Sequence, residues 1–169
     1  MDQIDHHFAD ATIRRDRDQF LRELLRELAT VLEESVGLKE SEGFISMVGS
    51  RIGEIMTREY QAASGLEKLS PSLVASALVD LKRRIDGGFR VESLDAEKMV
   101  LVNTACPFGH YVHGRRSLCM MTSNVFGKIA ASNLGYARVV LEETIARGDA
   151  GCRVVVHFEE GEDGREYYG

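Results

Sequence analysis

The sequence lacks the features of a membrane, secreted or nucleic-acid-binding protein. No apolar run approaches the roughly 20 residues that a membrane helix needs. The first ten residues, MDQIDHHFAD, are acidic and contain no hydrophobic stretch, so they do not resemble a secretory signal. The formal net charge of −6 argues against phosphate binding over the whole surface. We therefore expect a cytoplasmic protein that neither enters membranes nor binds nucleic acid directly.

Cysteine is also scarce, and its pattern narrows the chemistry. The chain has three cysteines, an odd number, and none of them forms a CxxC pair. A reducing compartment makes structural disulfides unfavourable, which leaves free thiols or metal ligands. No recognisable nucleotide-binding loop is present, so we infer no nucleotide.

What remains is typical of one soluble globular domain. The chain has 169 residues, of which 44% are hydrophobic and 28% charged. This length is sufficient for a sizeable core but gives no sign of a second domain. Residues 1–15 are polar and irregular and predict a flexible arm, which leaves residues 16–169 as a single sensor or output domain.

The hydrophobic periodicity predicts an α+β fold. Apolar residues at helical spacing predict three N-terminal helices, and β-rich runs then predict a four-stranded antiparallel sheet with one helix between its hairpins. The terminal segment 161–169 is expected to be loose. The predicted helices cover 16–37, 41–63, 70–88 and 117–135, and the predicted strands cover 89–94, 98–105, 136–145 and 152–160.

Local signals refine the helices. Ser70 followed by Pro71 is a strong helix start, and the basic residues 82–84 complement the dipole at the end of the same helix. Gly49 and Gly53 share one helix face, which favours close approach of another backbone over ligand contact. The leucine-rich first helix either packs on its own domain or forms a dimer contact.

The stretch NTACPFGHYVHGRRSLCMMTSNVFG, residues 103–127, is the candidate site. Cys106 is expected to end a strand, Cys119 to open a helix and Cys152 to open the last strand, so the three can converge from distant segments. Arg115, Arg116 and the helix dipole would favour the Cys119 thiolate. A shared metal site, a catalytic thiol and small apolar core residues all remain open at this point.

Several segments resemble known regulatory domains. GFISMVGSRIG, LVDLKRRIDGGF, NTACPFG and the run from SLCMM to CRVVV resemble the methanogen output domain type of small sensor module and, more distantly, 4-vinyl-reductase-like domains. The pattern CPFG…SLC with a late cysteine-containing strand also resembles the sensory halves of iron–sulfur-binding repressors. The resemblance covers most of the chain from Phe20 onward.

This resemblance implies a regulatory domain whose cysteines hold a metal centre. Carried onto this chain, it makes Cys106, Cys119 and Cys152 the ligands of an iron–sulfur cluster, as first choice, or of zinc. The relatives have a further cysteine where Thr144 stands here. The fourth position would then be filled by a His, Asp or Glu side chain, with His110 and His113 the nearest candidates, by an exogenous group, or by nothing.

The leading hypothesis is a stand-alone sensor that binds a metal centre or small ligand and signals to a partner protein, as a homodimer. The alternative is a thiol-dependent hydrolase or reductase that uses Cys106 or Cys119, with a loop histidine as base. No acidic group to orient such a base is evident, so a non-enzymatic role is favoured. The expected pocket residues around the thiols are Phe108, Arg115, Arg116 and Met120.

Overall fold

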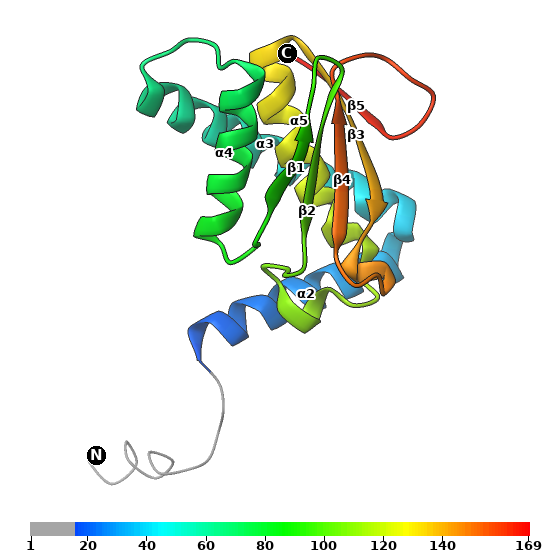
Figure 1. Cartoon of the computed structure of the whole chain (residues 1–169). Helices are drawn as coiled ribbons and strands as arrows, with labels where there is room; N and C mark the ends of the chain where they lie inside the picture. The colour runs from blue at the N-terminus through cyan, green and yellow to red at the C-terminus, as the bar shows by residue number, and fades with distance from the viewer. Residues whose placement is uncertain (1–15) are drawn as a thin grey trace, which may run out of the picture.

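The computed structural model describes residues 16–169, so the arm predicted for residues 1–15 lies outside the described part. Within it, the chain folds as α+β with four α-helices and a five-stranded antiparallel sheet (Figure 1). The α-helices are α2 (Arg17–Val36), α3 (Leu38–Ser64), α4 (Pro71–Arg84) and α5 (Cys119–Leu134). The strands are β1 (Arg90–Leu94), β2 (Lys98–Asn103), β3 (Tyr136–Glu143), β4 (Cys152–His157) and β5 (Arg165–Tyr168). Three short 3₁₀ turns, η1 (Gly109–Val112), η2 (Arg116–Leu118) and η3 (Ile145–Arg147), complete the order.

The helix boundaries follow from capping chemistry. Asp16 and Gln19 form a capping box at the start of α2, and the Ser70 side chain caps α4, with Pro71 in its first turn. The second helix begins at Leu38 rather than at the predicted Ser41. Gly37 has φ +85°, which favours glycine and lets the chain reverse in one residue between α2 and α3. Ser41 therefore lies buried inside α3.

The sheet has the order β1-β2-β4-β3-β5, in which the two predicted hairpins join through β2 and β4. The prediction of four strands and a loose tail was wrong in one respect, because residues 165–168 form a fifth strand paired with β3. Tyr167 anchors this strand: its side chain is buried over Gly127 of α5, and its hydroxyl lies 2.9 Å from the Ser123 hydroxyl. The strand has only four residues, of which the first two are charged, so the sequence signal is weak.

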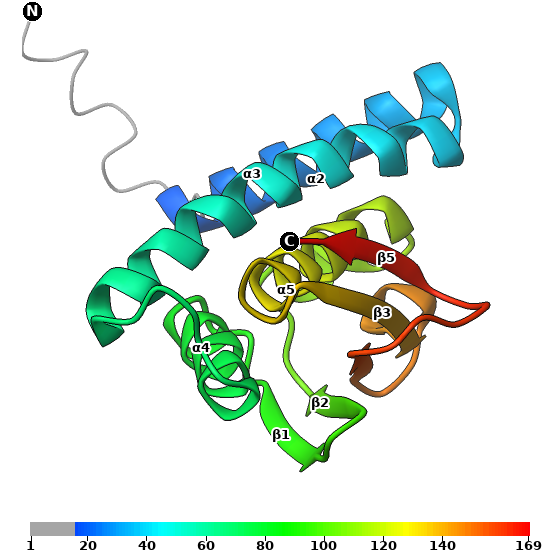
Figure 2. The ribbon, with the colours of Figure 1, turned by 90° about the horizontal axis from the view of Figure 1, so that it is seen from above.

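The helices form layers on one side of the sheet (Figure 2). The main core lies between α4, α5 and the sheet; it includes Phe126, Leu78, Leu101 and Val156. Helix α3 packs on the other side of α5, and α2 runs beside α3, so that the two helices form the outer layer. Among the helices within residues 16–169, none is both long enough and apolar enough to cross a bilayer.

The contact between α3 and α5 depends on the two glycines that the sequence placed on one helix face. A Cβ added to Gly49 would lie 2.7 Å from the Asn124 Cβ, and one added to Gly53 would lie 2.7 Å from the Lys128 Cβ. The prediction of close helix packing is therefore confirmed.

We expect Gly49→Ala to lower the free energy of unfolding by about 1–3 kcal/mol, because overpacking outweighs the gain in helix propensity. Gly43→Ala is the matched control in the same helix, since a Cβ there meets nothing within 4 Å. The control should raise stability by about 0.5–1 kcal/mol. Urea unfolding measures both; an equal gain for the two variants would contradict tight packing of α3 on α5.

Candidate functional site

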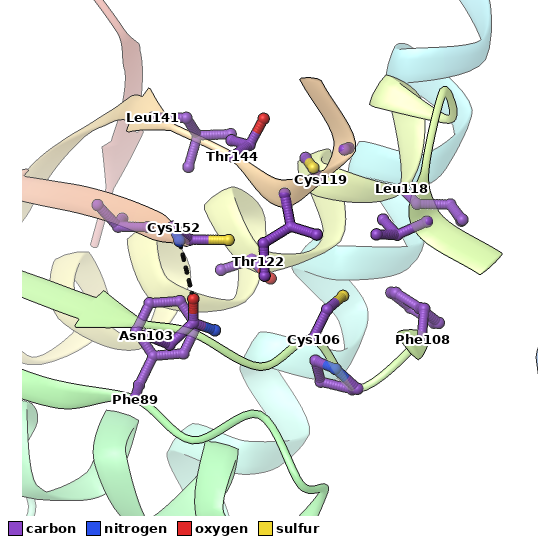
Figure 3. A pocket seen from close by; sticks show the side chains of 15 residues that line it. Phe89, Asn103, Cys106, Phe108, Leu118, Cys119, Thr122, Leu141, Thr144 and Cys152 are labelled. Atoms are coloured by element: carbon purple, nitrogen blue, oxygen red, sulfur yellow. Dashed lines mark hydrogen bonds between the residues drawn. The ribbon is translucent and has the colours of Figure 1, made fainter. Parts of the chain in front are cut away.

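All three cysteines line a single cavity between the sheet, the start of α5 and the loop after β2 (Figure 3). Cys119 opens α5 and Cys152 opens β4, as predicted, whereas Cys106 lies three residues beyond the end of β2. The cavity is small, with a volume of about 30 Å³. Its other lining residues, mostly apolar, are Phe89, Asn103, Pro107, Phe108, Val112, Leu118, Thr122, Leu141, Thr144, Ile145, Ala146 and Val154.

Asn103 fixes the geometry of two of the cysteine segments. Its side-chain oxygen accepts a 3.0 Å hydrogen bond from the Cys152 backbone N–H, and its side-chain nitrogen donates to the carbonyls of Gly87 and Ala105. This buried amide joins the end of β2 to the start of β4 and bends the chain toward Cys106. The two cysteines are thus held at the same end of the sheet.

The thiols are in their neutral form in this arrangement. Burial raises the pKa of Cys106 and Cys152 and raises that of Cys119 to about 11. Ionisation of either of the other two cysteines would raise the Cys119 pKa further, while a hydrogen bond with Thr144 lowers it. The expectation of a favoured Cys119 thiolate was therefore wrong, because burial of the thiol disfavours its charged form.

A buried amine, which the sequence reasoning missed, accompanies the thiols. Lys82 is only 5% exposed, and its Nζ donates a 2.8 Å hydrogen bond to the Thr122 hydroxyl. The same nitrogen lies 5.6 Å and 5.3 Å from the ring centres of Phe89 and Phe126. Desolvation lowers its pKa to about 8, whereas negative charge on the three cysteines acts to raise it. Within residues 16–169, no carboxylate forms an ion pair with it.

The signal for Lys82 was present in the sequence. Basic residues 82–84 were interpreted as charges that complement the helix dipole, but Lys82 follows Val74 and Leu78 at four-residue spacing, and both are fully buried. A lysine at an apolar-face position differs from its exposed neighbours Arg83 and Arg84, which pair with Asp80.

The remaining predicted site residues do not all reach the cavity. Phe108 lines it, whereas His110 is exposed on η1 and stacks on Tyr111 with ring centres 4.0 Å apart. Arg116 is exposed, and neither it nor Met120 is among the lining residues. Thr144, where relatives were expected to have a cysteine, does line the cavity.

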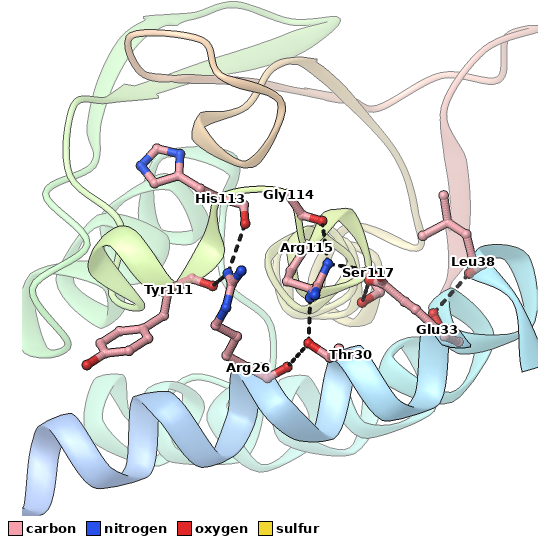
Figure 4. Close-up of polar contacts among 10 residues, drawn as sticks. Arg26, Thr30, Glu33, Leu38, Tyr111, His113, Gly114, Arg115 and Ser117 are labelled. Carbon is pink, nitrogen blue, oxygen red and sulfur yellow. Dashed lines mark hydrogen bonds and ion pairs between the residues drawn. The ribbon is translucent and has the colours of Figure 1, made fainter. Parts of the chain in front are cut away.

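The loop between β2 and α5, called the cavity loop below, is attached to α2 by polar side chains (Figure 4). Arg26 donates from Nη1 to the carbonyls of Tyr111, at 2.7 Å, and His113, at 2.9 Å. Arg115, expected in the pocket, instead donates from Nε to the Thr30 hydroxyl at 2.6 Å.

Two further contacts complete this attachment. The Ser117 hydroxyl donates to the Glu33 carboxylate. Ala29 of α2 is buried in a small apolar cluster with Val112 and Leu118, against which Cys106 and Cys119 also pack. Helix α2 therefore rests directly on the outer wall of the cysteine cavity.

Comparisons with known proteins identify related sequences and folds. The family model for methanogen output domain 1 matches residues 24–157. None of the curated proteins compared with the chain matches it. A similar solved structure is trafficking protein particle complex subunit 3 from Naegleria fowleri covalently bound to palmitic acid. It shares 16% identity at a TM-score of 0.63 and covers 85% of this chain and 95% of its own, a likeness that shows the fold alone.

We predict that Lys82→Met stabilises the metal-free protein by about 1–3 kcal/mol at pH 7, because an apolar side chain replaces a buried charge that lacks a carboxylate partner. The measurement is urea unfolding after treatment with chelator and reductant. Lys39→Met, an exposed change in α3, is the control and should shift stability by less than about 0.5 kcal/mol. A loss of stability for Lys82→Met would mean that nearby groups already compensate the Lys82 charge in the metal-free protein.

Proposed function

The chain belongs to the methanogen output domain 1 family, and we propose that it is a regulatory module whose Cys106, Cys119 and Cys152 bind a metal centre. An iron–sulfur cluster is the first choice and zinc the second, because thiolates suit both. The proposed setting is a reducing cytoplasm, in which the three cysteines stay free of disulfides. The protein would signal by shape change to a partner rather than catalyse a reaction.

The observation that carries this proposal is the meeting of three thiols in one apolar cavity, with the buried Lys82 amine near enough for their charge to act on it. The cysteines come from three segments separated by up to 46 positions, yet all three line the same cavity. Three thiolates together would repel one another, and a cation between them removes that cost. Lys82 supplies a further positive charge beside what would be an anionic metal–thiolate centre.

The donor atoms fit a thiophilic metal, but the spacing requires movement. Among residues 16–169, no three histidine, cysteine, aspartate or glutamate side chains are close enough together to hold a metal ion as they stand. Binding would therefore draw the Cys106 loop and the start of α5 toward Cys152. This contraction is the proposed signal, since a preformed site would change little on loading.

We expect α2 to transmit the movement of the cavity to the protein surface. The loop that would move carries Tyr111, His113 and Arg115, whose contacts with Arg26 and Thr30 hold α2 in place. A shift of this loop would displace α2 or release it. The output surface is accordingly expected on the outer side of this helix.

A second candidate is a small apolar ligand in the same cavity. The walls are mostly apolar, and the structurally similar trafficking subunit carries covalently bound palmitic acid. A thiol-dependent enzyme receives less support, because burial raises the pKa of all three thiols and His110 is exposed and does not line their cavity. Intact-mass analysis of the purified protein would reveal an attached acyl group.

We expect each of Cys106→Ser, Cys119→Ser and Cys152→Ser to lose most of the metal that the wild-type protein contains, because removal of one ligand opens the shell. The measurement is iron, zinc and sulfide content after anaerobic purification. Thr104→Ser, an exposed change beside the site, is the control and should retain full metal content.

Two outcomes would contradict the proposal. Metal-free wild-type protein from anaerobic purification would exclude a metal centre and favour the apolar ligand. Full metal content in Cys152→Ser alone would reduce Cys152 to a core residue. Non-additive losses in double variants are expected if all three share one centre.

Thr144→Cys is predicted to tighten zinc binding at least tenfold, because it adds a fourth thiolate to a three-thiolate set. Thr144 lines the cavity and already hydrogen-bonds with Cys119, so its replacement faces the proposed ligands. Competition with a chromophoric chelator, under reductant, measures the affinity. Thr144→Ser controls for loss of the methyl group, and unchanged affinity for Thr144→Cys would place the metal elsewhere.

A further inference from the structure

Helix α2 is packed with its polar side inward and its apolar side outward. Arg26, Thr30 and Glu33 lie on the side that bonds to the cavity loop. At helical spacing on the opposite side, Leu24 is 43% exposed and Leu28 is 57% exposed. A surface helix in a complete globular domain has the reverse arrangement. Within the described residues 16–169, this apolar side of α2 stays uncovered.

Helix α3 extends the same surface. Its inward side carries Gly49 and Gly53, which contact α5, and its opposite side exposes Phe44, Val48 and Ile52. The two helices run side by side as the outermost layer of the fold (Figure 2), so their outward stripes adjoin. We refer to the exposed apolar residues of α2 and α3 together as the α2–α3 face.

The area of this face matches a stable protein interface. About a dozen large apolar side chains, each roughly half exposed, present on the order of 1,000 Å². The largest apolar patch on a typical monomer is about 300–600 Å². A stable interface buries about 800 Å² on each partner. The α2–α3 face thus exceeds the first value and suffices for the second.

We infer that a second copy of this chain covers the α2–α3 face, so that α2 and α3 of the two copies form a four-helix layer. Two antiparallel helices of 20 and 27 residues offer a self-complementary surface suited to a two-fold contact. Residues 17–36 carry more acidic than basic groups, which disfavours an anionic lipid surface. The inference names the partner of the proposed regulatory module; its link to metal sensing rests on the proposed function, but the contact itself does not.

The test is sedimentation velocity of the full chain at about 20 μM, a range in which a modest interface is already populated. The wild-type protein should be a dimer. Leu28→Glu on α2 and Val48→Glu on α3 should each raise the dimer dissociation constant at least tenfold. Leu66→Glu is the matched control, since Leu66 is 46% exposed in the loop after α3 and should leave the dimer intact. Far-UV circular dichroism checks the fold of each variant.

Because the two disruptive changes lie on separate helices, the second variant still tests the dimer if the first one misfolds. A monomeric wild-type protein, a dimer that survives both changes, or a control that dissociates equally would overturn the inference. Metal content measured on the same samples separates the two proposals. A metal-loaded monomer overturns the dimer alone, and a metal-free dimer overturns the metal centre alone.

Discussion

The burial of the Lys82 ammonium group is the constraint on which the candidate site depends. The lysine extends from α4 to Thr122 of α5 and lies near two phenylalanine rings, so one charge connects α4, α5 and the strand entry at Phe89. Burial of a cation without an anionic partner is costly. The three cysteines are the groups whose negative charge acts on it, and each of them is itself desolvated. Amine and thiols therefore stabilise one another only when the cavity acquires negative charge, as a metal–thiolate centre would supply.

The packing of α2 and α3 outside the cavity determines which helix would respond to metal binding. The absence of side chains at Gly49 and Gly53 lets α3 lie directly on α5. Helix α2 is attached differently, through Ala29 and a few polar side chains to the loop beside the cysteines. The more weakly held helix thus borders both the proposed sensing cavity and the α2–α3 face. In the proposed regulation, α2 would move with the loop beside the cysteines while the contact between α3 and α5 is kept.

Much of the fold was readable from the sequence because local signals agreed with it. The capping residues at Asp16 and Ser70 located the starts of two helices, and the paired glycines correctly indicated close packing. The fifth strand was missed because its pairing with β3 depends on the tertiary contact of Tyr167 with Gly127. The convergence of the three cysteines followed from their places at element ends. The directions of Arg115 and His110 did not, since these depend on how α2 rests against the loop.

The central claim is that the cavity thiols hold a metal, and X-ray absorption spectroscopy tests it most directly. The sample is the anaerobically purified full chain, measured at the iron edge and at the zinc edge. The account predicts a metal whose nearest neighbours are mainly sulfur, with the sulfur signal lost when Cys106, Cys119 and Cys152 are all replaced by serine. A first shell of nitrogen and oxygen alone, or a spectrum unchanged in the triple variant, would contradict it.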